Sequence, residues 1–230
     1  MALVKFGGGV TQMSGSIGGT TFARNRFGNY ARSRTKPVNP NTILQTNVRG
    51  YIGLLAQKWH DTLTPAQRIA WSTYANAVAM KNRLGESTYN TGFNHYLRVN
   101  TVRLQLEKSQ CPNAPHILSL PEKDPTFAIS ASVATQLITV TLSTGLPWQS
   151  ITASVFGVWM GEPQLVTRNY FGGPWKKAGA IAADAVAPIT VVPPYTLVLG
   201  QKVWCYGRIA TGPTDSRLSE QMAANCTVGA

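Results

Sequence analysis

The feature that most constrains this chain is a change of hydrophobic period across a proline-rich segment. Up to residue 108, apolar residues recur every three or four positions, which is typical of amphipathic helices. Beyond residue 125 the period becomes two, as in the run ITVTL at 138–142, and this alternation predicts half-buried strands. The segment between them contains Pro112, Pro115, Pro121 and Pro125. Because proline interrupts both helices and sheets, we expect residues 109–125 to link a helical domain at 42–108 to a β domain at 126–230.

Two helices are predicted in the first part of the helical domain. The first covers residues 42–61, and its apolar stripe consists of Val48, Tyr51, Ile52, Leu55 and Trp59. The second begins after Thr64, an N-cap followed by Pro65 at the first helical position and Gln67 at the capping-box position. The short connection predicts a helical hairpin. The side chains expected to face the first helix are Ile69, Ala70, Trp71, Tyr74, Ala75 and Val78.

A third helix is expected from Thr91 to Glu107, after a loop from Lys81 to Asn90. The residues predicted to pack are Phe93, Tyr96, Leu97, Val102 and Leu104. The polar complement is expected to consist of Asn94, Arg98, Asn100 and Arg103.

The β domain repeats the period-two pattern in four further segments, at residues 151–159, 164–170, 189–192 and 203–209. Segments of this length, separated by turns with glycine and proline, predict an antiparallel, immunoglobulin-like β-sandwich of about six or seven strands. The predicted fold class is therefore α+β, with several domains.

Residues 1–41 are expected to form an extended arm. Its glycines lower the helix propensity of this segment and supply no side chains for a core. These glycines are Gly7, Gly8, Gly9, Gly15, Gly18 and Gly19. Within the arm, Thr21–Arg24 and Tyr30–Arg34 flank a turn-rich segment, which predicts a β-hairpin.

The net charge of +12 is concentrated toward the N-terminus, because residues 1–110 hold 14 basic against three acidic residues. The arm interleaves arginines with aromatic residues, and we expect this cluster to bind a partner: Phe22, Arg24, Arg26, Phe27, Tyr30, Arg32, Arg34 and Lys36. Arginine forms bidentate contacts with carboxylates, which favours an acidic protein surface. Arginines and aromatic residues also bind phosphates and stack on bases, so nucleic acid is the alternative partner.

No catalytic, cofactor-binding or metal-binding residues are predicted. His60, His95 and His116 stand in no metal-ligand spacing, and the glycine-rich start lacks the Gly-Lys-Ser/Thr of a phosphate loop. The three cysteines, without CxxC spacing, indicate free thiols, with a Cys205–Cys226 disulfide as the alternative. Trp148 and Trp175 lie beside prolines in expected loops, where tryptophan could anchor a neighbouring protein or a glycan.

No signal peptide or membrane-spanning segment is expected either. The first twenty residues lack a basic start followed by a long apolar run, and no stretch of about 18 apolar residues occurs in the chain. We therefore expect the protein to be made in a cytoplasm and not to bind a membrane.

An ordered series of motifs resembles a poorly characterised family encoded by tailed phages and prophages. These motifs cover about the first 105 residues: GSIGGTTFARNRFGNY at 15–30, RSRTKPVNP at 32–40, LTPAQR at 63–68 with Trp71, and GFN at 92–94. The resemblance implies a virion-associated role. Near the other end, LGQKVWCYGR at 199–208 followed by SRLS at 216–219 resembles the last strands of fibronectin type III domains.

These features together favour a non-enzymatic structural protein of the virion, assembled in the host bacterial cytoplasm. We expect a capsid decoration or cement protein that docks on the head lattice through its arm. Its partners would be the major capsid protein or other virion proteins, with a homo-oligomer or many copies on the lattice. A neck, tail or fibre component and an internal nucleic-acid-binding protein are the alternatives. A surface glycan hydrolase would need a pair of carboxylates in a cleft.

Overall fold

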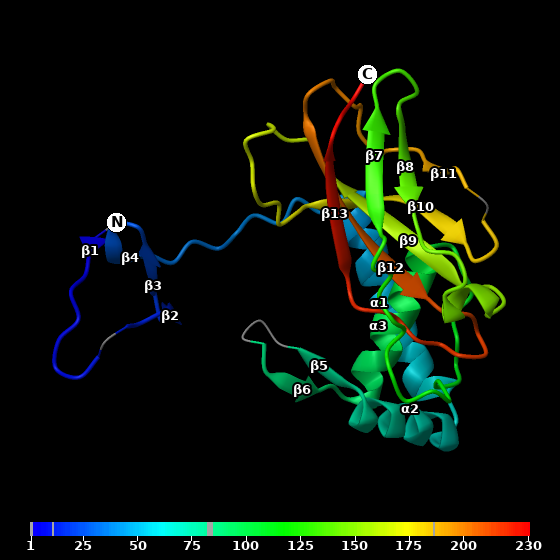
Figure 1. Cartoon of the computed structure of the whole chain (residues 1–230). Coiled ribbons are helices and arrows are strands. Elements are labelled where there is room, and N and C mark those ends of the chain that lie inside the picture. Colours follow the sequence, from blue (N-terminus) through cyan, green and yellow to red (C-terminus); the bar gives the residue numbers. More distant parts are fainter. Residues whose placement is uncertain (1, 11, 82–84, 186) are drawn as a thin grey trace. The chain divides into compact units, whose positions relative to one another are not determined.

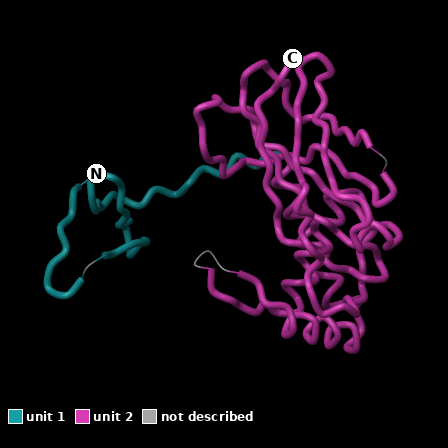
Figure 2. The backbone as a smooth tube through the Cα atoms, viewed as in Figure 1, with its two compact units in different colours: residues 1–43 teal, residues 44–230 magenta. Residues whose placement is uncertain are grey.

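A computed structural model describes residues 2–10, 12–81, 85–185 and 187–230. The chain forms two compact units, residues 1–43 and residues 44–230 (Figure 2). Its described residues contain three α-helices and several antiparallel sheets (Figure 1), which confirms the α+β class. We describe each unit separately.

The first unit is a small antiparallel sheet with the strand order β1-β4-β3-β2. The strands are β1 (Ala2–Leu3), β2 (Gly15–Ile17), β3 (Thr20–Asn25) and β4 (Gly28–Ser33). None of the described residues of this unit is fully buried. The rings of Phe6 and Phe22 lie with their centroids 6.5 Å apart. The predicted arm is therefore a sheet without a buried core.

The helices of the second unit are α1 (Ile43–Asp61, which begins on the last residue of the first unit), α2 (Pro65–Ala77) and α3 (Gly92–Gln105). The predicted capping box is confirmed: the Gln67 amide donates to the Thr64 hydroxyl at 3.3 Å, and the Thr64 amide donates to the Gln67 side-chain carbonyl at 2.9 Å. Thr91 caps α3 by accepting from the Asn94 amide at 3.2 Å.

The predicted packing of α2 against α1 needs correction, because α2 packs mainly against α3 (Figure 1). Trp71 of α2 meets Tyr96 of α3 edge to face, with centroids 5.7 Å apart. Ile69 was expected to be packed but is 67% exposed, and Ala70 is exposed too. Trp59 of α1 also reaches Tyr96, at 5.4 Å. The central helix is therefore α3, which the hydrophobic period alone did not single out.

Two short paired strands lie between α2 and α3, partly within the segment from Lys81 to Asn90 that was predicted as a loop. They are β5 (Ala79–Lys81) and β6 (Ser87–Tyr89), which pair antiparallel. Residues 82–84 of the predicted loop lie outside the described residues.

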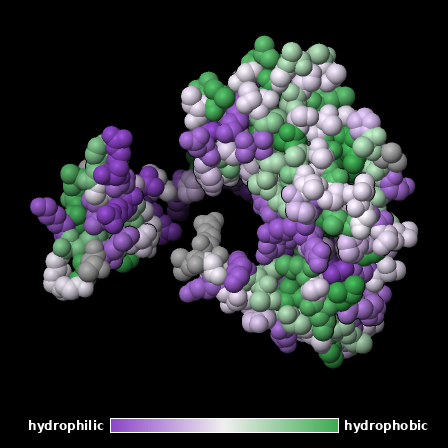
Figure 3. All heavy atoms as spheres, viewed as in Figure 1, coloured by the Kyte–Doolittle hydropathy of each residue, from purple (hydrophilic) through white to green (hydrophobic). Residues whose placement is uncertain are grey.

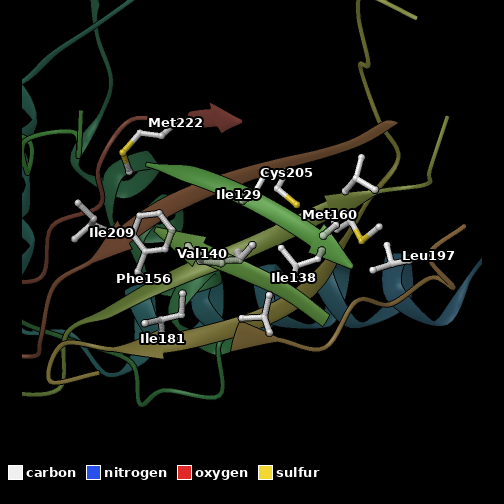
Figure 4. Close-up of a cluster of buried hydrophobic side chains, with 14 of the residues drawn as sticks. Ile129, Ile138, Val140, Phe156, Met160, Ile181, Leu197, Cys205, Ile209 and Met222 are labelled. Atoms are coloured by element: carbon white, nitrogen blue, oxygen red, sulfur yellow. The ribbon is translucent and has the colours of Figure 1, made fainter. Parts of the chain in front are cut away.

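Seven strands follow in the described part of residues 126–230. They are β7 (Ala128–Ser132), β8 (Leu137–Thr141), β9 (Val155–Gly161), β10 (Trp175–Ala182), β11 (Ile189–Val191), β12 (Lys202–Ala210) and β13 (Met222–Thr227). One sheet has the order β11-β8-β7 and the other β10-β9-β12-β13. The two sheets share a buried core to which Ile138, Phe156 and Ile209 contribute (Figure 4).

One predicted strand is wrong: residues 164–170 form no strand, apart from a single bridge between Gln164 and Lys202. Leu165 and Tyr170 are exposed, so this apolar alternation has no sheet face to cover. The strand β10, which begins at Trp175 after the following glycines and proline, was not predicted.

Two of the four residues of the polar complement predicted for α3 are buried. Asn100 and Arg103 are fully buried. The Asn100 carbonyl oxygen accepts from the Cys111 amide at 2.6 Å, and Arg103 donates to the carbonyls of Ser109 at 2.9 Å and Thr211 at 2.5 Å. These side chains satisfy backbone groups of irregular segments, which would otherwise be buried without partners.

The helices and the four-stranded sheet share a second core. Tyr96 and Val99 of α3 and Leu106, which follows its end, belong to the same buried cluster as Val155 and Trp159 of β9. Residues 109–125 contain no helix or strand, as predicted. They are nevertheless fixed to the helices, because the Trp71 indole donates to the Pro112 carbonyl at 2.9 Å.

Within this second core, His95 is a buried imidazole without a hydrogen-bond partner. Both of its ring nitrogens lack one, and its ring meets Tyr74 edge to face at 5.3 Å. Burial, with a contribution from the Arg98 charge, lowers its pKa from 6.5 to about 4. The folded protein therefore holds His95 neutral.

We predict that His95 makes the protein acid-sensitive. Because its pKa is lower in the folded state, the unfolded state takes up the proton first, so stability is full above about pH 6.5 and falls until about pH 4. The total loss is about 3 kcal/mol. Urea unfolding from pH 7 to pH 4.5 should show most of this loss in the wild type and in His60→Gln. The loss should be much smaller in His95→Phe; an unchanged slope in that variant would assign it to other groups.

Candidate docking surface on the N-terminal sheet

The hairpin of β3 and β4 carries most of the residues predicted to bind a partner. In its register Phe22 lies opposite Ala31, and Ala23 lies opposite Tyr30. The predicted hairpin is therefore confirmed, with strands that start and end within two residues of the expected positions.

Arg34 and Lys36 lie beyond the end of β4. The Arg34 amide still donates to the Gly19 carbonyl at 2.8 Å, so the backbone remains attached to the sheet at this point. Lys36 is exposed in the segment that follows.

The register divides the predicted cluster between the two faces of the sheet. Opposed residues of an antiparallel pair share a face, and successive residues of a strand alternate. Phe22 and Arg24 therefore lie on one face, whereas Tyr30 and Arg32 lie on the other. The sequence had grouped these residues together, but a flat partner contacts only one of the two sets.

The tip of the hairpin presents a cation and an aromatic ring together. The Arg26 guanidinium lies 4.8 Å from the centre of the Phe27 ring, which is 73% exposed. The Asn25 side chain accepts from the Phe27 amide at 2.9 Å and so fixes the turn. The chain leaves the turn at Gly28, whose φ of +117° is a conformation that side chains disfavour.

All of the charged side chains of the first unit are basic. Residues 1–43 contain six basic side chains and no aspartate or glutamate, a net charge of +6; the basic residues are Lys5, Arg24, Arg26, Arg32, Arg34 and Lys36. Residues 44–230 contain fifteen basic and nine acidic residues over more than four times the length. The positive charge density is therefore far higher in the first unit, which attracts acidic partners.

The sheet also exposes apolar side chains that the sequence-based prediction missed. Leu3 and Ile17 are 76% and 68% exposed. A hollow of about 1060 Å³ lies next to the hairpin tip, and Leu3, Phe6, Val10 and Phe27 are among its lining residues. Figure 3 shows apolar and hydrophilic residues side by side on this unit. The signal for Leu3 was present in the sequence, because the short run Ala2-Leu3-Val4 precedes the glycines.

The tryptophans proposed as loop anchors differ in their surroundings. Trp148 is 3% exposed and packs against Phe156 inside the β core, so it is not available to a neighbouring protein. Trp175 is half-buried at the start of β10 and packs edge to face on Phe171 at 4.9 Å. The cysteines Cys111, Cys205 and Cys226 are free thiols.

In the part of the chain that the structure describes, no group of three or more histidine, cysteine or acidic residues is arranged to hold a metal ion. None of the helices in those residues is long and apolar enough to cross a membrane.

Comparison with known proteins gives no assignment: no protein-family model matches the chain, and no curated protein matches it.

We predict that Gly28 controls the formation of the hairpin. Alanine at its positive φ costs about 1 to 2 kcal/mol, which a sheet without a buried core cannot easily absorb. Gly28→Ala should weaken the cross-strand nuclear Overhauser effects between β3 and β4. Gly7→Ala is the matched control, because its φ lies outside the positive range and no atom lies within 4 Å of the added carbon. Equal effects in both variants would contradict this role.

Proposed function

We propose that the protein is a non-enzymatic structural protein of a virion, and specifically a capsid decoration or cement protein that docks on the head lattice through residues 1–43. One observation carries the proposal: this unit combines six basic residues, no acidic residue and no buried side chain among its described residues.

Such a unit gains most of its order on a partner. Ordering a backbone residue costs about 1 to 2 kcal/mol, and burial of apolar surface must offset this cost. The sheet supplies little burial itself, but it exposes Leu3, Ile17 and Phe27. A partner surface that covers these side chains and offers carboxylates to the arginines would supply both the apolar burial and the ion pairs that stabilise the ordered unit. The major capsid protein or another virion protein is the partner that we propose.

A repetitive surface fits this mode of attachment. When many copies are present, or when the protein is a homo-oligomer, weak individual contacts combine into stable attachment. The motif series that resembles tailed-phage proteins includes this same unit, at residues 15–40. It supports location in the virion.

We further propose that residues 126–230 are an immunoglobulin-like sandwich of the fibronectin type III kind. The first, second and fifth strands of this segment lie in one sheet, and the third, fourth, sixth and seventh lie in the other. A seven-strand division of this type, with one core between the sheets, supports the proposal. The fold leaves the binding target open, because such domains serve many functions.

A neck, tail or fibre position is the alternative within the virion. The number of copies in purified particles distinguishes the two: a decoration protein is present in a number set by the capsid lattice, whereas a neck or fibre protein forms one small ring or trimer. A count that matches a single ring would reject the decoration role.

Nucleic acid is a second candidate partner, favoured by the charge of the first unit and by Phe27 and Tyr30 beside the arginines. Binding of this kind weakens steeply with salt. Particles emptied of DNA that retain the full amount of the protein would argue against it.

We predict that deletion of residues 1–36 abolishes incorporation into particles without unfolding the second unit. The capped helices and both large sheets lie outside the deleted segment, so the unfolding midpoint of the remainder should change little. Incorporation is measured by mass spectrometry of particles assembled with the truncated chain.

A charge variant in the second unit, Arg68→Glu, is the control and should still be incorporated. Normal incorporation of a folded truncated chain would contradict docking through the first unit. Loss of incorporation in both variants would show that the deletion is not specific.

A further inference from the structure

Two arginines of the second unit converge on a hollow on the outer face of the four-stranded sheet. Arg98 of α3 and Arg208 of β12 line it together with Trp159 and Tyr206, and its volume is about 360 Å³. A neighbouring hollow of about 260 Å³, toward the start of α1, shares Gln105 and Trp159 with it. All of the residues that line these two hollows belong to the second unit.

The aromatic wall of the hollow is fixed by a glycine. Gly157 lies opposite Arg208 in the register of β9 and β12. A carbon added at Gly157 would lie 2.6 Å from the Trp159 ring and 2.8 Å from a methyl group of Leu106, so only glycine lets the ring lie there. The Trp159 ring stacks on Tyr206 at 5.0 Å with an interplanar angle of 7°. The wall is therefore preformed.

The two arginines differ in their hydrogen-bond partners. Arg98 donates from its two terminal nitrogens to the carbonyls of Leu218 and Ser219, each at 2.8 Å. The Nε of Arg208 is buried and has no hydrogen-bond partner. Burial lowers the pKa of both side chains, and the charge of Arg208 lowers that of Arg98 further, to about 10.

None of the ion pairs in the described residues neutralises these two charges. Glu220, the acid whose charge acts on Arg98, forms an ion pair with Lys123 at 2.6 Å. A partly buried guanidinium without an acceptor costs free energy. An anion that accepts from the terminal nitrogens of Arg208 would neutralise this charge and would also reduce the repulsion from Arg98.

We propose that this hollow binds a carboxylate group, with Arg208 as its main ligand. A guanidinium pairs with a planar carboxylate through two parallel hydrogen bonds. The terminal nitrogens of Arg98 already donate to carbonyls, so Arg208 is the free cationic group that faces the hollow. One such group suits a ligand with a single negative charge better than a phosphate dianion. Ile52, Leu97 and Val102 line the same hollow and suit a carboxylate on an apolar stem.

The carboxylate can come from an acidic side chain of a partner protein or from a small organic acid. The test therefore titrates the full chain with sodium propionate and with the capped tripeptide Leu-Glu-Leu, at constant ionic strength. The capped Leu-Gln-Leu tripeptide and inorganic phosphate are the comparison ligands. The readout is the position of the Arg208 Nε–H resonance in nitrogen-15 spectra, supported by the thermal unfolding midpoint.

We expect propionate and Leu-Glu-Leu to shift this resonance and to raise the unfolding midpoint, whereas Leu-Gln-Leu has no effect. Tighter binding of the peptide assigns the site to a protein partner, and equal binding assigns it to a small acid. In Arg208→Gln, the affinity measured from the midpoint should fall at least about tenfold. The control Arg68→Gln, in α2, should bind as the wild type does.

Arg208→Gln should fold, and its midpoint without ligand should equal or exceed that of the wild type, because it removes a charge that has no partner. If this variant fails to fold, Arg208→Lys replaces it, since lysine keeps the charge but loses the fork of donors. The proposal is overturned if propionate acts no differently from chloride, if phosphate binds more tightly, or if the Arg208 variants bind equally well.

Discussion

The second unit depends on the hydrogen bonds that α3 donates to irregular backbone. Arg98, Asn100 and Arg103 of this helix reach the carbonyls of two segments, residues 109–111 and residues 211–219. Hydrogen bonds from charged donors contribute about 1.5 to 3 kcal/mol each. Without them, both segments would bury carbonyls without partners between the helices and the sheet. These contacts fasten α3 to the four-stranded sheet and bring helices and strands into one core.

The two units differ in how they are stabilised. The inner face of the β10-β9-β12-β13 sheet packs on the three-stranded sheet, and α3 packs against its outer face. The second unit thus has buried cores of its own although it also exposes side chains such as Leu165, whereas the first unit has no buried residue among those described and carries a net charge of +6. Because net stability is a small difference between large terms, a sheet without a core stays ordered only weakly by itself. We infer that attachment is the task of the first unit.

Local signals in the sequence predicted much of the fold, whereas the contacts between residues far apart in the sequence could not be predicted. The hairpin and the start of α2 follow from turn residues and from the Thr64–Gln67 capping box, which act within a few positions. The role of Arg103 could not be predicted, because its acceptor at Thr211 is more than a hundred residues away. The alternation at 164–170 resembles a strand, yet no neighbouring strand extends along it. At the docking surface the residue types were predictable, whereas their division between two faces required the register of β3 and β4.

Native-state hydrogen exchange of the full chain, measured amide by amide at neutral pH, tests the central claim most directly. The account predicts that amides of α3, β9 and β12 exchange with one common, high free energy, since a single core joins them. Amides of β3 and β4 should exchange much faster, at a free energy close to zero. Protection of β3 and β4 equal to that of β12 would contradict the claim that the first unit needs a partner. Separate opening energies for α3 and β12 would contradict the claim of one shared core.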